Sequence, residues 1–227
     1  MATRHVLAEI AEIAAAAGLP AVEISSVGGV DAAARVADGE TFDLVFLAEG
    51  ALTSLAAGGH VDRSSVTPLL LSPVAVAVAS GSPDTPAEAV AAPAFADAAG
   101  VRAALRAARR VGYSTGPSGT ALVRLIDEWG LADEIGERLR QARPGVPVAR
   151  DLADGEVDLG FQQLSELVGQ PGVRILGVLP EDCAIETVFA GAVGTASTDP
   201  ALAAELLAFF RGAARQGAAA THSFVAL

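Results

Sequence analysis

The sequence predicts an α/β protein made of two similar lobes. A helix, the segment Ala-Asp-Gly-Glu and an apolar strand follow one another in residues 30–46, and the same succession returns in residues 148–161. Each glycine stands where a helix would end, and a further helical segment follows each strand. The order is common in α/β proteins, but two copies roughly 115 residues apart favour two lobes. A single large sheet that contains both copies is the alternative.

Two long β-rich runs lie where the lobes would be joined. Residues 68–80 form the first run, which is too long for one strand of a small sheet and is interrupted by Pro73. Residues 184–193 form the second run. We expect both to cross between the lobes as hinges. The predicted lobes are residues 1–72 plus 186–227, and residues 73–185.

Apolar residues at helical spacing and clusters of turn-forming residues place the other elements. The predicted helices cover residues 2–17, 30–36, 51–57, 101–110, 121–129, 148–152 and 164–168. Turns between strand and helix are expected at residues 48–50 and 162–163, a loop at 82–93, and a polar, alanine-rich tail at 216–227.

A strand that ends in a turn of hydroxyls and glycines is the most informative segment. Residues 111–113 form the strand end, and Ser-Thr-Gly-Pro-Ser-Gly-Thr follows at 114–120 before a helix. A helix start carries unpaired backbone N–H groups at the positive end of the helix dipole, which together hold an anion. No lysine follows the glycines, so a nucleoside-triphosphate loop is excluded. The segment is either a cradle for a small oxyanion or carboxylate, or an ordinary capped helix.

Composition and charge restrict the possible partners. Apolar residues make up 52% of the chain and charged residues 19%, as expected for a folded globular protein. The net charge of −12 argues against nucleic acid and anionic membranes as partners. No apolar run approaches the roughly 20 residues that span a bilayer. The single cysteine, Cys183, excludes an internal disulfide and is expected to be buried and inert. The three histidines lie far apart, so neither a metal site nor a cofactor is predicted.

The N-terminal residues lack the apolar segment and small-residue cleavage site of a signal peptide. As written, the chain is therefore expected in the cytoplasm. A true start further upstream would instead predict a periplasmic or extracellular protein.

Four segments, at residues 25–29, 42–47, 112–119 and 155–167, share an order and spacing with a known family. They resemble the type 2 periplasmic-binding-protein fold in its molybdate-binding-protein-like branch, over residues 4–212. The resemblance implies an α/β protein whose two lobes, with hinge strands and an interlobe cleft, close on a small anionic ligand. It also implies an ABC transporter permease as partner, if a signal peptide is missing from the sequence as written. The branch includes aconitate-isomerase-like proteins.

Carried over residue by residue, the resemblance implies ligand contacts from both lobes. The first lobe would offer Ser26 with the amides of Val27 and Gly28, and the start of the first helix, Thr3 and Arg4, would lie close by. The second lobe would offer the hydroxyl turn, a helix start and the turn after the second-copy strand. These residues are Thr115, Ser118, Gly119, Pro147, Val148, Gln162 and Gln163.

Several side chains leave alternatives open. Arg4 either neutralises the anion as a bidentate donor or is simply exposed. Gln162 and Gln163 find partners either in the ligand or in backbone groups. Tyr113 caps the ligand, donates a proton to it, or fills the lobe interface. His5 is either a general base or a surface residue.

The chain departs from the family pattern at both ends. The first residues already read as a helix, where family members begin with a strand and a serine-containing turn. Either the start has been placed too late, or the first lobe has lost a strand. The tail at residues 216–227 replaces the usual closing helix.

Three functions are compatible with these features. The first is capture of a small anion, for which an organic carboxylate fits slightly better than a molybdate-like oxyanion. The second is isomerisation of an unsaturated carboxylate by proton transfer, although no strongly placed acid/base pair is visible. The third is a ligand sensor that depends on a partner chain. Whether the protein is an enzyme stays open.

Overall fold

The computed structural model describes residues 2–81 and 86–227. The chain divides into two compact units, residues 1–72 with 188–227 and residues 73–187. Two strands, β2 (Thr67–Ala79) and β7 (Glu186–Val193), run from one unit into the other. Each unit is an α/β layer structure with its own apolar core.

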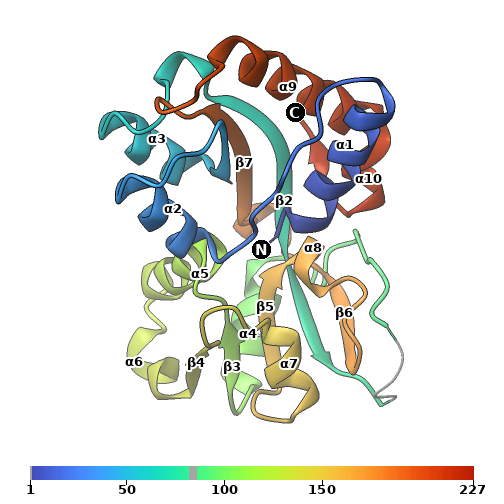
Figure 1. Ribbon diagram of the computed structural model, residues 1–227. Helices are drawn as coiled ribbons and strands as arrows, with labels where there is room; N and C mark the ends of the chain where they lie inside the picture. Colours follow the sequence, from blue (N-terminus) through green and yellow to red (C-terminus); the bar gives the residue numbers. More distant parts are fainter. Residues whose placement is uncertain (1, 82–85) are drawn as a thin grey trace. The chain divides into compact units, whose positions relative to one another are not determined.

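In the first unit, helices cover both faces of an antiparallel sheet (Figure 1). Strand β1 (Leu44–Ala48) pairs with β7, and the short β8 (Val225–Ala226) pairs with β2. Side chains of β1 alternate between two cores, as the two-residue period of a strand requires. Val45 and Leu47 face one core, and Leu44 and Phe46 face the other.

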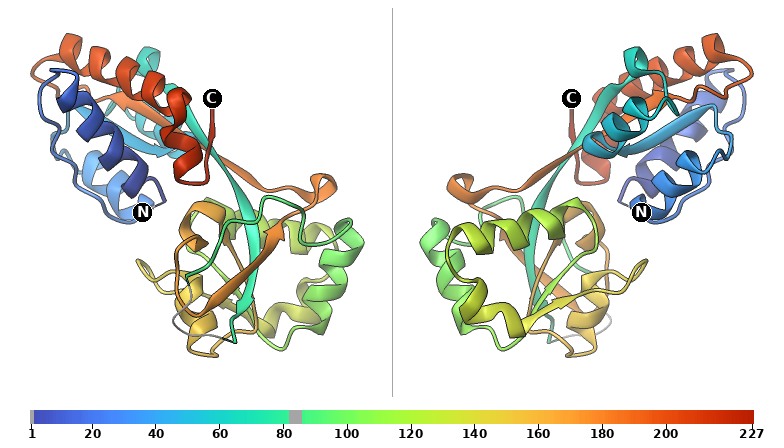
Figure 2. Two further views of the ribbon diagram at one scale, coloured as in Figure 1. Left: turned by 90° about the vertical axis from the view of Figure 1, so that its right-hand side faces the viewer. Right: turned by 90° about the vertical axis from the view of Figure 1, so that its left-hand side faces the viewer.

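The helices of the first unit follow this alternation. Helices α2 (Gly29–Ala37) and α3 (Glu49–Ala57) cover the face of Val45 and Leu47. Helices α1 (Arg4–Ala16) and α9 (Pro200–Ala213) lie side by side on the other face (Figure 2).

In the second unit, β6 (Val173–Val178), β2, β5 (Leu159–Gln163), β3 (Val111–Tyr113) and β4 (Leu139–Gln141) form the sheet in that order. Strand β3 runs parallel to β4 and β5, whereas β2 runs antiparallel to β5 and β6. The first face is covered by α4 (Ala98–Ala107), α5 (Pro117–Glu128) and α6 (Ala132–Ile135). The second face is covered by α7 (Val148–Ala153) and α8 (Leu164–Leu167).

The predicted internal repeat corresponds to α2–β1–α3 and α7–β5–α8. Both glycines that follow the first helix of a copy have positive φ, +93° at Gly39 and +72° at Gly155. In each copy the next amide closes the helix end, from Glu40 to the Arg35 carbonyl at 3.0 Å and from Glu156 to the Asp151 carbonyl at 2.8 Å. Glycine is favoured here because other residues are strained at this φ.

The aspartate before the second-copy strand fastens β5 to its neighbour. The Asp158 carboxylate accepts hydrogen bonds from the amides of Arg109 and Arg110, at 2.9 and 2.6 Å. Burial acts to raise the pKa of Asp158, but these hydrogen bonds outweigh burial and leave that pKa below its usual value. Asp158 therefore helps to position β3 beside β5.

Several predicted element boundaries are wrong. Residues 67–79 form one continuous strand through Pro73, which lies where β2 passes from one unit to the other and needs no amide hydrogen bond there. The predicted helix 101–110 ends at Ala107, and α5 begins four residues before the predicted start. The turn expected at 48–50 is absent, because α3 begins directly after β1. The loop expected at 82–93 lies partly outside the described residues, and residues 86–93 form only isolated bridges.

The C-terminal segment is not a polar tail. Helix α9 continues through a π-helical turn (Ala214–Ala218) into α10 (Ala219–Thr221), and β8 then returns to β2. Ala218, Ala219 and Phe224 are buried in the first unit's core. The segment thus completes this core. Among the described residues, no helix combines the length and apolar character required to cross a membrane.

Candidate functional site

The second unit brings its predicted polar residues together at one sheet edge. Parallel pairing aligns Tyr113 with Phe161, so β3 and β5 end side by side. The hydroxyl turn follows β3, and Gln162 and Gln163 end β5. The carboxyl ends of parallel strands are where α/β proteins commonly place ligands.

Helix α5 begins at this edge with an open N-terminus. Gly116 is its N-cap, Pro117 occupies the first turn, and the helix has neither a side-chain cap nor an acidic residue in that turn. By contrast, α2 and α3 carry Asp31 and Glu49 in their first turns, which already complement their dipoles. The positive end of α5 is therefore available to an external anion.

The start of α5 is held rigidly against the preceding turn. The hydroxyl oxygens of Ser114 and Ser118 lie 2.9 Å apart, and both residues are buried. A Cβ atom at Gly119 would lie 1.9 Å from the Ser114 carbonyl oxygen, so only glycine allows this approach. Thr115 is partly buried beside them, and Tyr113 packs against the core beneath α5.

The amides of Gly119 and Thr120 donate to the Gly116 carbonyl, at 3.1 and 3.2 Å, and Pro117 has no N–H. The donors that remain for a ligand at this turn therefore include the Ser118 amide and one hydrogen of the paired serine hydroxyls.

Gln162 is a capping residue. Its Oε1 accepts a hydrogen bond from the Val148 amide at 2.8 Å, at the start of α7, where Pro147 is the N-cap. Its Nε2 donates to Oε2 of Glu166 at 3.0 Å. The turn predicted at 162–163 does not exist, because both glutamines belong to β5 and are buried. For Gln162, the backbone-capping alternative describes the contact observed.

Gln163 has an acceptor without a partner. Its Nε2 donates to Thr187 Oγ1 at 2.7 Å, but its Oε1 has no partner among the described residues. The residue is only 3% exposed. A buried polar group left unpaired costs about 1–3 kcal/mol. Gln163 Oε1 is therefore a buried acceptor without a partner among the described residues.

Glu166 was missed by sequence reasoning. It lies in the first turn of α8, immediately after β5, and is partly buried. Burial raises the pKa of Glu166, and the hydrogen bond from Gln162 opposes this only in part. The available signal was its position three residues after the strand end at Gln163, where the next helix begins.

The first unit offers a weaker donor group. Ser26 is exposed, and Val27 and Gly28 are half-buried before α2, whose N-cap is Gly28 without a side-chain hydrogen bond. A Cβ atom on Gly28 would lie 3.2 Å from Oδ2 of Asp31, so a carboxylate already faces this helix start. At the start of α1, Thr3 is an N-cap without a side-chain hydrogen bond and Arg4 is exposed.

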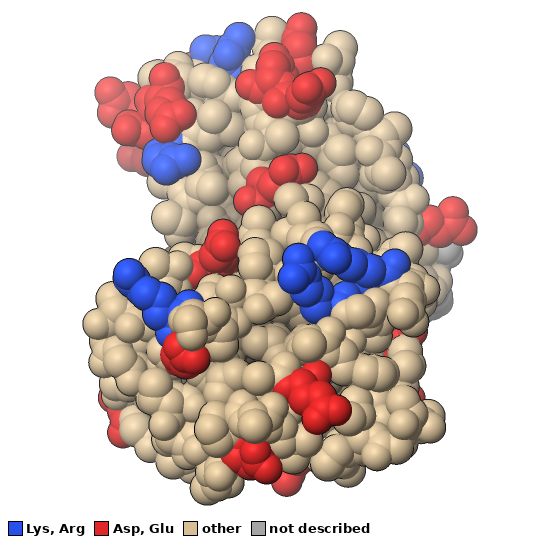
Figure 3. Space-filling model, turned by 90° about the horizontal axis from the view of Figure 1, so that it is seen from above, with Lys and Arg blue, Asp and Glu red and all other residues tan. Residues whose placement is uncertain are grey.

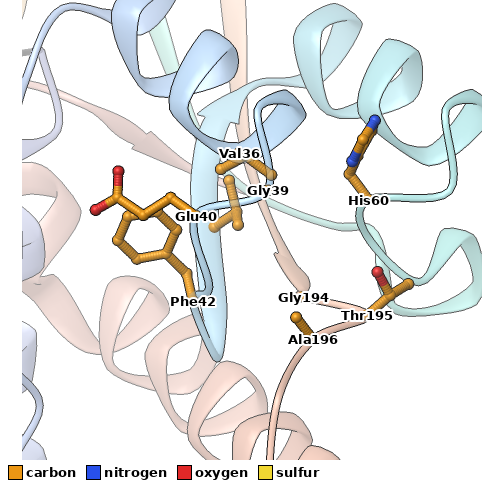
Figure 4. A pocket seen from close by; sticks show the side chains of 9 residues that line it. Val36, Gly39, Glu40, Phe42, His60, Gly194, Thr195 and Ala196 are labelled. Atoms are coloured by element: carbon orange, nitrogen blue, oxygen red, sulfur yellow. The ribbon is translucent and has the colours of Figure 1, made fainter.

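A hollow of about 320 Å³, including space open to solvent, lies elsewhere in the first unit (Figure 4). Glu40 and His60 line it, but Arg35 binds the Glu40 carboxylate, and Figure 4 shows that group and the His60 ring on separate sides. The hollow therefore lacks converging donors and is a weaker ligand site than the start of α5.

Two of the three histidines, His5 and His222, are closer together than the sequence indicated. The rings of His5 and His222 stack with centroids 6.5 Å apart, and Nε2 of His222 lies 2.7 Å from Glu9 Oε2. No cluster of three or more His, Cys, Asp or Glu suited to a metal occurs among residues 2–81 and 86–227. Cys183 is buried as expected, and burial raises the pKa of its thiol to about 11. On the face in Figure 3, basic side chains form only small separate groups.

Known proteins share both the fold and the sequence pattern. The family model for bacterial extracellular solute-binding proteins matches residues 1–225. An aconitate isomerase from Pseudomonas sp. is 33% identical over 175 residues, which are 77% of this chain and 64% of that relative. The chain thus matches less than two thirds of that relative's length.

Two solved structures establish the fold. The periplasmic molybdate-binding protein of Azotobacter vinelandii has a TM-score of 0.73 at 20% identity and covers 98% of this chain and 95% of its own. A substrate-binding domain from Clostridium difficile, named for a molybdenum ABC transporter, has a TM-score of 0.72 at 13% identity and covers 100% and 95%. The predicted type 2 periplasmic-binding-protein fold and the molybdate-binding-like resemblance are confirmed. The chain belongs to the bacterial extracellular solute-binding protein family.

Proposed function

We propose that the protein binds a small organic carboxylate or oxyanion at the start of α5. The observation that carries the proposal is an uncapped helix N-terminus without an acidic side chain in its first turn, beside two buried serine hydroxyls. Backbone and hydroxyl donors hold an anion without a counter-charge. This arrangement fits an acidic protein with a net charge of −12.

The unpartnered acceptor of Gln163 favours an organic acid as ligand. A fully deprotonated tetrahedral oxyanion brings only acceptors and would leave Gln163 Oε1 unpaired. An organic acid with a hydroxyl or a protonated carboxyl brings a donor as well. The similarity to an aconitate isomerase supports the same class of ligand.

A second candidate function is isomerisation of an unsaturated carboxylate. Two observations support it: the similarity to aconitate isomerase, and a partly buried carboxyl of raised pKa, Glu166, at the same sheet edge. A raised pKa makes a carboxylate a stronger proton acceptor, which suits a general base.

The family is one of extracellular solute-binding proteins, so we propose that the protein acts outside the cytoplasm with an ABC permease. We also propose that residues 1–72 plus 186–227 and residues 73–185 act as its lobes. Strands β2 and β7 would then serve as the hinges.

Thermal unfolding in the presence of candidate anions tests the binding function. The panel contains trans-aconitate, citrate, malate, molybdate, sulfate and phosphate. An acid at about 100 times its Kd stabilises the native protein by about 2.7 kcal/mol, which raises the Tm by about 5–10 °C.

Two substitutions on the same helix locate the binding. Ser118→Ala removes a buried hydroxyl and is expected to weaken binding about 10- to 100-fold. Glu128→Gln removes an exposed carboxylate at the other end of α5 and serves as the control, with unchanged affinity. If no anion in the panel raises the Tm of the unmodified protein, the binding function is wrong.

A further inference from the structure

The carboxyl group of Glu166 does not contribute to anion binding. It is partly buried, and no ion pair to Glu166 occurs among the described residues. A carboxylate in such a place is destabilised by the loss of water. It also repels an anionic ligand. A site built only to hold an anion would be better served by a neutral side chain.

The position of this carboxyl is fixed through Gln162. The Gln162 Oε1 must face the Val148 amide, because an N–H can donate only to the oxygen. The amide nitrogen of Gln162 therefore faces Glu166 and donates to its Oε2. One carboxyl oxygen is thus held by a side chain that is itself held at its other end, and no hydrogen bond to Oε1 occurs among the described residues.

Hydrogen-bond donors that could stabilise the charge formed on proton removal lie at the same sheet edge as Glu166. Glu166 follows the end of β5, and the hydroxyl turn follows the end of β3, so the carboxyl and the α5 donors share one sheet edge. Donors that hold the ligand's carboxylates also stabilise the negative charge that develops when a neighbouring carbon loses a proton.

Other titratable groups of the second unit are less suited. Burial also raises the pKa of Asp151, but the charges of Arg143, Asp154 and Glu156 lie around it. The Cys183 thiol, with a pKa of about 11, stays protonated near neutral pH.

We infer that Glu166 is the base that moves a proton between two carbons of an unsaturated carboxylate held at the start of α5. The inference rests on the proposed function and assigns a catalytic residue to the second candidate, isomerisation of an unsaturated carboxylate. The Glu166 carboxylate takes a proton from the CH₂ group next to the ligand's double bond. The electron pair of that C–H bond forms a new double bond to the central carbon. The old double bond's electrons form a C–H bond at its far carbon with the proton that Glu166 returns. No oxidant or reductant is needed.

Proton NMR of trans-aconitate in deuterated water tests this assignment. The unmodified protein is expected to convert the acid to its cis isomer and to exchange CH₂ protons for deuterium. Glu166→Gln keeps the hydrogen bond to Gln162 and the shape of the side chain but removes the base. We expect conversion and exchange to fall by about 10²–10⁴-fold. The stabilisation of the protein by trans-aconitate should persist, because the α5 donors are untouched.

Two further variants guard against a merely structural effect. Glu128→Gln removes an exposed carboxylate on α5 that pairs with Arg124, and should convert at the unmodified rate. Glu166→Asp retains a base set back by one carbon and should convert at an intermediate rate. If Glu166→Gln fails to fold, the conversion rate of Glu166→Asp provides the test instead.

The outcomes separate the two proposals. Conversion by Glu166→Gln at the unmodified rate would overturn the role of Glu166. So would an unmodified protein that is stabilised by trans-aconitate but neither converts it nor exchanges its protons, and the binding function would then stand. A protein that no organic acid stabilises would contradict organic-acid binding itself.

Discussion

Gly119→Ala is expected to destabilise the protein by about 2–4 kcal/mol and to abolish anion binding. The added Cβ would lie 1.9 Å from the Ser114 carbonyl oxygen, so the start of α5 must move away from the hydroxyl turn. The loss should occur although alanine favours a helix over glycine by about 1 kcal/mol. Urea unfolding followed by fluorescence of Trp129, the only tryptophan, measures the effect at the other end of the same helix.

Gly116→Ala is the matched control for this substitution. A Cβ atom at Gly116 would meet only Ser114 Oγ, at 3.8 Å, and the backbone there is extended with negative φ. Its stability should stay within about 1 kcal/mol of the unmodified protein. Equal effects of the two substitutions would show that close packing at Gly119 does not hold the turn.

Phe210→Ala is expected to destabilise the first unit by about 3–5 kcal/mol. The side chain is fully buried in α9, and its ring stacks on Phe46 with centroids 5.3 Å apart. Its removal leaves a cavity between α9 and β1, because a close-packed core relaxes only in part. Thermal unfolding followed by far-ultraviolet circular dichroism measures the loss.

The neighbouring Phe209→Ala provides the comparison. Phe209 is only partly buried at the margin of the same core, so its truncation should cost about 1 kcal/mol. A larger loss for Phe209 than for Phe210 would contradict the description of this core.

The repeat was predictable because its glycine turns depend on local rules. In each copy the glycine of Asp-Gly-Glu follows a helix, where the chain needs a positive φ. Both Gly39 and Gly155 adopt such a φ. The start of α5 was predicted four residues too late, although Gly116-Pro117 is a pair typical of a first helical turn.

Contacts between segments far apart in the sequence were not predictable. The role of Gln162 depends on Val148 and Glu166, which meet it only after α7 and α8 pack on one face of the sheet. The alanine-rich C-terminus lacks a distinct polarity pattern, so the sequence did not predict its burial against α1 and β2. The approach of His5 to His222 has the same cause.

The most direct test of the account is an NMR titration of the isotopically labelled full chain with trans-aconitate. The largest changes in amide chemical shift are expected at Gly116 and residues 118–120, where α5 begins. Changes confined to the hollow around His60 and Thr195 in the first unit, with residues 116–120 unaffected, would contradict the account.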